Sequence, residues 1–165
     1  MAANQFAPWV EPIAAGYRES RAESVRLAQS LDEHALVQPT GDSGWTVRDE
    51  LVHIAASGTD FARLLDPIVR GETPDTSVFA DIDARNSRNL ESRRGWSIAE
   101  IGTDLEGNGS LVQELLQKLH ADDEARQPQG FPFSLKDLLG GYGQHDAYHL
   151  DQIRQATGST RGQAT

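Results

Sequence analysis

The stretch WTVRDELVHIAASGTDFARLL, residues 45–65, carries the clearest helical pattern in the chain. Its apolar residues recur at intervals of three and four, so they share one face of an α-helix. These residues are Val47, Leu51, Ile54, Ala55, Gly58, Phe61, Ala62 and Leu65. Thr46 precedes Asp49 by three positions, the spacing of a capping box, in which a hydroxyl and a carboxylate bind free amides of the first turn. We therefore expect a helix from Trp45 or Thr46 to about Val69.

The same periodicity predicts three more long helices. They are expected over residues 10–36, 97–120 and 134–157. The last two also begin with a capping box, because Ser97 lies three residues before Glu100 and Ser134 lies three residues before Asp137. The run GNG at 107–109 could bend or break the helix that contains it, since glycine disfavours helical backbone.

Four long amphipathic helices and no strand pattern predict an all-α fold, a four-helix bundle. The connection between the second and third of these helices, about 70–96, is long and could hold a short helix at 79–93. A chain of 165 residues favours a single domain, whose core would span about 10–157. The segment 158–165 is small and polar, and we expect it to be flexible.

The composition disfavours several classes of function. The net charge of −10 opposes binding to nucleic acid. No apolar run is long enough to cross a bilayer, and the first residues show no secretory signal. The chain has no cysteine, which excludes disulfides, thiolate metal ligands and a cysteine nucleophile. We expect a cytoplasmic protein that acts on a small molecule and has no nucleic-acid or membrane partner.

Two histidines stand four residues apart in LLGGYGQHDAYHLDQI, residues 138–153. Both His145 and His149 fall on the apolar side of the last helix, one turn apart. A buried imidazole without a partner costs about 1–3 kcal/mol, so each needs a hydrogen bond, a charge or a metal ion. An i,i+4 pair is able to offer two nitrogens to one ion. Two separately satisfied core histidines, or a pair at the end of the bundle in contact with water, would also explain the pattern.

Polar residues beside this pair have open roles. Asp146 falls inside the apolar arc, where it could orient a histidine, contact a substrate or pair with an arginine of another helix. Tyr142 and Tyr148 flank the pair and could donate a hydroxyl, although core packing is an alternative for Tyr142. The run HDAYH differs from the zinc-protease motif HExxH by an aspartate, and little chain follows it for a third ligand. We do not expect a protease.

Three glycines in the same stretch weaken the helix. Gly140, Gly141 and Gly143 each cost roughly 1 kcal/mol relative to alanine in a helix interior. They either allow close packing of a neighbouring helix or leave room for a ligand beside the histidines, and the pattern does not distinguish the two.

The run WTVRDELVH, from Trp45 to His53, together with HDAYH late in the chain, resembles the DinB/YfiT-like proteins. By helical position alone, His53 lies on the flank of its apolar stripe and would be partly exposed. The resemblance covers roughly residues 10–157 and implies a divalent metal ion held by His53, His145 and His149. Zinc is the first expectation, with nickel, iron or manganese as alternatives. The resemblance also implies a homodimer.

Three classes of function follow from such a site. The first is a metal-dependent enzyme that activates a low-molecular-weight thiol, as an S-transferase or isomerase, because the resemblance includes enzymes that use mycothiol or bacillithiol. The second is a hydrolase that uses metal-bound water, for which Asp146 is the candidate general base. The third is a metal-binding or small-molecule-binding protein without turnover, with a role in stress response.

Overall fold

The computed structural model describes residues 6–41 and 44–158, and this part of the chain is all-helical without strands. The helices are α1 (Glu11–Ser30), α2 (Glu33–Leu36), α3 (Val47–Val69), α4 (Ile82–Ser92), α5 (Ile98–Leu116) and α6 (Leu135–Thr157). Two 3₁₀ turns, η1 (Ser77–Phe79) and η2 (Ala121–Asp123), lie in the connections. The predicted all-α fold is confirmed.

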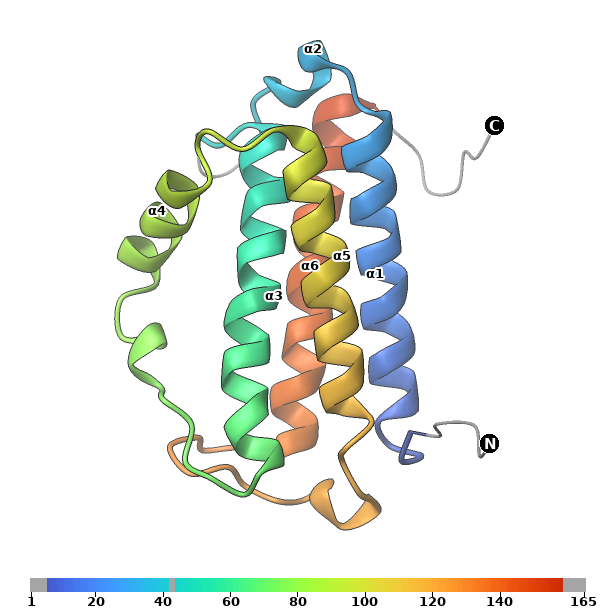
Figure 1. Cartoon of the computed structure of the whole chain (residues 1–165), viewed down its shortest axis with the longest axis vertical. Coiled ribbons are helices and arrows are strands. Elements are labelled where there is room, and N and C mark those ends of the chain that lie inside the picture. The colour runs from blue at the N-terminus through green and yellow to red at the C-terminus, as the bar shows by residue number, and fades with distance from the viewer. Residues whose placement is uncertain (1–5, 42–43, 159–165) are drawn as a thin grey trace.

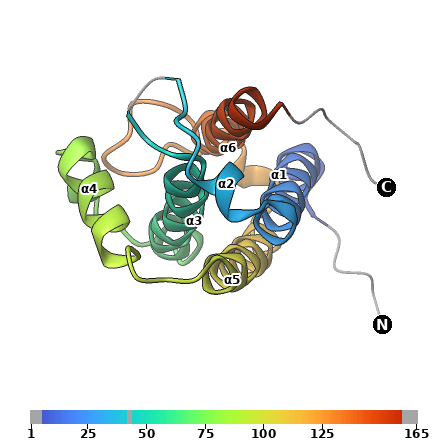
Figure 2. The same ribbon diagram turned by 90° about the horizontal axis from the view of Figure 1, so that it is seen from above.

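Four of the helices form a bundle that stands upright in Figure 1. Helices α1 and α3 each pack against both α5 and α6, so they occupy opposite corners of a four-sided arrangement, as seen from above in Figure 2. Helix α2 covers one end of the bundle, and α4 lies outside α3 within the long connection to α5. The four-helix bundle and its long connection are thus as predicted.

The helix starts are built by the predicted caps. Thr46 and Asp49 form a complete capping box at the start of α3, and Ser97 and Glu100 form one at the start of α5. At α6 the Ser134 hydroxyl accepts a hydrogen bond from the Asp137 amide at 3.2 Å and donates its own proton to the Asp137 carboxylate at 2.7 Å. Each hydroxyl satisfies an amide that has no partner within the helix, so all three starts lie where predicted.

The helix predicted over 10–36 is interrupted. Helix α1 ends at Ser30, and the backbone of Leu31 and Asp32 is extended. The Asp32 carboxylate accepts a hydrogen bond from the Ala35 amide at 2.8 Å and so begins the separate turn α2. A short acidic side chain that binds backbone amides ahead of it competes with continued helix, and this local bond is the physical reason for the break.

The helix predicted over 97–120 ends earlier but is unbroken at its glycines. Helix α5 ends at Leu116, where the amides of Lys118 and Leu119 bond to carbonyls three residues back instead of four. The Asp123 carboxylate then accepts from the His120 amide at 2.8 Å and begins η2. The segment 107–109 is regular helix, against the bend or break considered for it. There Asn108 is buried and donates to the Ala55 carbonyl at 2.8 Å, which ties α5 to α3 at this point.

The connection between α3 and α5 crosses the outer side of α3. Asp81 caps α4 by accepting from the Ala84 amide at 2.9 Å, and α4 then packs on α3, which confirms the short helix expected near 79–93. Before it, the Phe79 ring lies 5.6 Å from the guanidinium carbon of Arg85. The connection therefore brings side chains of η1 and α4 over the α3–α6 side of the bundle.

The core consists of two apolar clusters separated by a polar layer. One cluster contains Phe61, Leu65, Val112, Leu116, Leu135 and Leu139, and the other contains Leu51, Ile54, Ile101, Leu105, Leu150 and Ile153. Between them along the helices lie the buried polar residues Arg21, Asn108 and Asp146. Burying polar groups costs free energy unless they are paired, so we expect each of these three side chains to have a polar partner.

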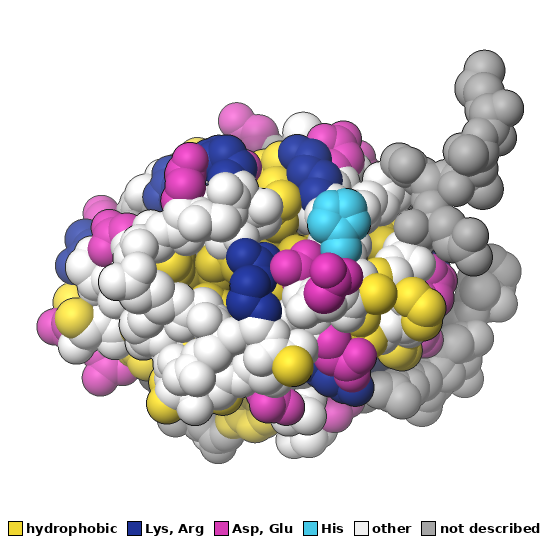
Figure 3. Space-filling view, turned by 90° about the horizontal axis from the view of Figure 1, so that it is seen from below, with side chains coloured by type: hydrophobic (Ala, Val, Ile, Leu, Met, Phe, Trp, Pro, Cys, Tyr) yellow, Lys and Arg dark blue, Asp and Glu magenta, His cyan; other side chains and the backbone are white. Residues whose placement is uncertain are grey.

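The end of α6, the apolar character of the helices and the charges on the surface complete the description of the fold. Gly158 ends α6 with a positive φ of 68°, a left-handed cap that favours glycine. The segment predicted to be flexible was 158–165, and all of it beyond Gly158 lies outside the described residues. Among the described helices, none has the length and apolar character to cross a bilayer. On the face shown in Figure 3, acidic and basic side chains are interspersed.

Candidate metal centre

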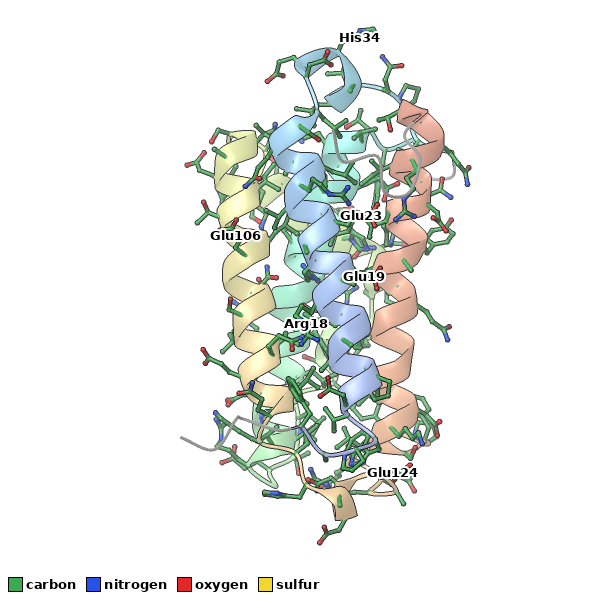
Figure 4. All side chains as sticks on the ribbon, turned by 90° about the vertical axis from the view of Figure 1, so that its right-hand side faces the viewer. Arg18, Glu19, Glu23, His34, Glu106 and Glu124 are labelled. Carbon is green, nitrogen blue, oxygen red and sulfur yellow. The ribbon has the colours of Figure 1, made fainter. Side chains whose placement is uncertain are left out.

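The structure brings together the three histidines expected to bind metal. His53 comes from α3, and His145 and His149 come from successive turns of α6. One ring nitrogen of each lies within 4.8 Å of those of the other two. Two other histidines, His34 and His120, are exposed near helix ends and are not part of this group, and His34 is seen at the top of the bundle in Figure 4.

The spacing of these nitrogens suits a single divalent ion. Nε2 of His53 lies 2.9 Å from Nε2 of His145. A tetrahedral ion with bonds of roughly 2.0–2.1 Å to imidazole would hold its ligand nitrogens about 3.3 Å apart. Small rotations of the rings would therefore be enough to admit the ion. Three imidazoles without a fourth protein ligand are the donor set of a catalytic rather than a structural zinc site.

His53 is more buried than its helical position alone suggests. Only 3% of its surface is exposed, because Trp45, in the segment before α3, lies with its ring centre 4.9 Å from that of His53. The indole also stacks nearly parallel to His149 at 6.2 Å. A flank position on one helix becomes an interior position once the preceding loop folds over it.

His53 is neutral at physiological pH. Burial, followed by the neighbouring His149 and His145, lowers the pKa of His53 from 6.5 to about 2. A neutral imidazole keeps a lone pair for coordination, whereas a protonated one repels a cation. The local electrostatics therefore favour the form of His53 that binds metal.

Glu50 orients His149, a contact that the sequence analysis missed. Nδ1 of His149 donates to Glu50 Oε2 at 2.6 Å, and the Thr40 hydroxyl donates to Glu50 Oε1 at 2.7 Å. This leaves Nε2 of His149 free to bind an ion, and a carboxylate behind a histidine in this way is the usual arrangement at metal sites. Glu50 lies among apolar residues on the buried face of α3. A carboxylate at such a position indicates, in the sequence itself, that it has a buried polar partner.

Asp146 is buried beneath His145 and is paired with an arginine. Its carboxylate is 1% exposed and lies 3.0 Å from Nε of Arg21 on α1. Oδ1 of Asp146 also lies 3.3 Å from Nδ1 of His145. Two of the roles considered for Asp146, pairing with an arginine and orienting a histidine, are therefore both seen in its contacts.

A cavity of about 580 Å³ opens beside the three histidines. Its apolar walls come from Trp45, Phe79, Ile82, Phe133, Leu138 and Tyr142. Its polar groups include Ser57, Asp60, Arg85 and Asn86, of which the last two come from α4. Asp60 accepts from Asn89 Nδ2 at 3.1 Å and lies 3.7 Å from Nε of Arg85. The roles of Asp60 and Arg85 are not predictable from the sequence, because nothing in their local pattern shows that α4 folds over α3.

Of the three glycines in the first half of α6, one lines this cavity and two border another groove. Gly141 lines the cavity, and a side chain there would meet no atom within 4 Å of its Cβ, so this glycine leaves room rather than permitting close packing. Gly140 and Gly143 have equally open surroundings but border a different groove, between α1 and α6.

The two tyrosines of α6 have different surroundings. Tyr142 stacks on Phe61 with 3.8 Å between the ring centres, and burial raises its pKa to about 12. Tyr148 is half exposed, with its ring edge against His149.

The bundle and its three convergent histidines define the class: an all-helical protein with a site able to hold a divalent metal ion. The chain belongs to the DinB superfamily, whose family model matches residues 17–153. The match includes all three histidines and confirms the family that the sequence resembles. No match was found among curated proteins or among solved structures.

Proposed function

We propose that this protein is a metal-dependent enzyme that activates a low-molecular-weight thiol, as an S-transferase or isomerase. The observation that carries the proposal is the position of the three histidines at the wall of a cavity of about 580 Å³. A divalent ion bound there would act as a Lewis acid and stabilise a thiol in its thiolate form. The thiol would be supplied from outside, because the chain has no cysteine.

Different residues of this chain would hold the ion, keep water away from it and bind the substrate. His53, His145 and His149 would hold the ion, with zinc as the first expectation and nickel, iron or manganese as alternatives. Trp45 shields two of these imidazoles from water. The apolar walls exclude solvent from the bound molecule, and Arg85 and Asn86 offer hydrogen-bond donors to polar groups of a small thiol.

Hydrolysis is the second candidate, supported by the carboxylate of Asp60 in the cavity wall. A hydrolase needs a general base that is able to reach bound water. Asp146 is poorly placed for this role, since it does not line the cavity and its carboxylate is paired with Arg21. Asp60 replaces it as the candidate base in this alternative.

The metal content of the purified protein tests the proposal at its first step. Elemental analysis of protein prepared without added metal should find close to one divalent ion per chain. His145→Ala should lose most of it, whereas His34→Ala, which alters an exposed histidine away from the site, should keep it. Equal metal content in the unaltered protein and His145→Ala would rule out the three-histidine site.

Thiol consumption distinguishes the classes of function. Loss of a small thiol in the presence of a generic electrophile should depend on the metal and stop after treatment with a chelator. Metal-dependent cleavage of esters or amides without thiol consumption would favour the hydrolase. Bound metal without either activity would favour a binding protein. Light scattering tests the homodimer that we also expect from the family.

A further inference from the structure

We propose that Arg21 is a positioning residue for the candidate metal centre, which it reaches through Asp146. Arg21 stands on α1, a helix that contributes none of the three histidines. The inference rests on the proposed metal site, because orientation of His145 matters only if His145 is a ligand. It assigns a role to the polar layer between the two apolar clusters of the core.

A chain of contacts leads from Arg21 to His145. The Arg21 side chain is only 6% exposed, and its guanidinium meets both carboxylate oxygens of Asp146: Nε is 3.0 Å from Oδ2 and Nη2 is 3.5 Å from Oδ1. Oδ1 is also 3.3 Å from Nδ1 of His145. A carboxylate held by an arginine is fixed in place, and as an acceptor at Nδ1 it leaves Nε2 of the imidazole free for a metal ion.

Arg21 is itself held in place by Asn108. Nη1 of Arg21 donates to Oδ1 of Asn108 on α5 at 3.0 Å, and Asn108 in turn donates to the Ala55 carbonyl on α3 at 2.8 Å. The guanidinium is thus bound on two sides. Gly58 makes room for this arrangement, because a Cβ there would lie 2.4 Å from Oδ1 of Asn108 and 2.9 Å from Nη1 of Arg21.

Stability alone is a weak reason for this network. A buried ion pair repays little more than its own desolvation, and apolar residues of similar volume often serve the core as well. The layer runs across all four bundle helices and ends at one of the three histidines. We therefore infer that the network holds the imidazole of His145 in place, rather than adding to the packing of the core.

The two histidines of α6 are consequently supported from different directions. His149 is oriented by Glu50 on α3, the helix that also carries His53. His145 is oriented from α1 and α5 through Asp146, Arg21 and Asn108. Metal affinity is then coupled to the packing of the two helices that contribute no ligand.

The test measures metal binding in Arg21→Met, Asp146→Asn and the double variant. Zn²⁺ affinity is measured by competition with a chelator, and bound Co²⁺ is monitored by its visible absorption. Each single change should lower Zn²⁺ affinity roughly tenfold to a hundredfold and alter the Co²⁺ spectrum. The double variant should be no weaker than the more affected single variant, because both changes remove one path. If Arg21→Met does not fold, Arg21→Lys should show a smaller loss, since it keeps the charge but not the two-sided contact.

A second α1–α6 ion pair provides a matched control. Glu23, labelled in Figure 4, accepts from Nε of Arg154 at 2.9 Å, and this pair lies outside the polar layer. Arg154→Met should therefore alter thermal stability while leaving Zn²⁺ affinity and the Co²⁺ spectrum unchanged. Unchanged affinity and spectrum in Arg21→Met would overturn the positioning role but leave the proposed function intact. Failure of the unaltered protein to bind either ion would overturn both.

Discussion

Nδ1 of His149 donates a 2.6 Å hydrogen bond to Glu50, across the interface between α6 and α3. Glu50 and His53 lie one turn apart on α3, so this helix supplies one candidate ligand and the carboxylate that orients another. The Thr40 hydroxyl occupies the second oxygen of Glu50, which fixes the carboxylate from the loop before α3. The position of His149 thus depends on three segments of the chain.

We expect Glu50→Gln to lower metal affinity by roughly tenfold to a hundredfold, because a neutral amide is a weaker acceptor for the imidazole N–H. Chelator competition measures the change. Asp49→Asn is the matched control: it alters the capping box one residue away and should cost about 1 kcal/mol of stability without changing metal affinity. A Glu50→Gln protein with unaltered affinity would show that this contact is structural only.

We expect Gly141→Leu to reduce turnover of a thiol and electrophile at least severalfold while metal content is retained. The new side chain would enter the cavity next to the histidines, where the Cβ itself meets nothing within 4 Å. Gly140→Leu, in the neighbouring position but facing the groove between α1 and α6, should leave turnover unchanged. Equal turnover in all three proteins would place the substrate elsewhere.

We expect Gly58→Ala to destabilise the protein by about 1–3 kcal/mol, because its methyl group would collide with Asn108 and Arg21 in a packed interior. Gly107→Ala provides the contrast. Its Cβ meets nothing within 4 Å on α5, and alanine should stabilise that helix by about 0.5–1 kcal/mol. Urea unfolding measures both changes, and a neutral Gly58→Ala would contradict the close approach of α3 and α5.

We expect the metal-free protein to lose stability as the pH falls below about 6.5. The unfolded chain binds a proton at His53 near its ordinary pKa of 6.5, whereas burial lowers the pKa of folded His53 to about 2. The contribution of neutral His53 is complete above pH 6.5 and is lost as the pH falls towards 2, at about 1.4 kcal/mol per pH unit. Unfolding free energies at about pH 7.5 and pH 5.5 measure it. His53→Gln should reduce the difference by about this amount, and an equal pH dependence would refute the shift.

Much of the fold is predictable because its signals are local. A hydroxyl three residues before a carboxylate satisfies helix amides wherever the chain goes next, so Ser97 and Ser134 mark true helix starts. Helix ends are less predictable, since the break at Asp32 depends on a competing side-chain bond and α5 ends at Leu116 in turns that the periodicity does not show. Such bonds differ by only about 1 kcal/mol from continued helix.

The four amphipathic helices are predictable from the chain alone, because periodicity and capping act within a few residues. The family and its three histidines were expected from the resemblance of WTVRDELVH and HDAYH to the DinB/YfiT-like proteins. Three further features follow only from the folded arrangement: Trp45 buries His53, Glu50 meets His149, and α4 brings Arg85 to the cavity. The same holds for the path from Arg21 to His145. These contacts join segments far apart in sequence, and a charged residue on an apolar face shows that a partner is needed without showing which helix supplies it.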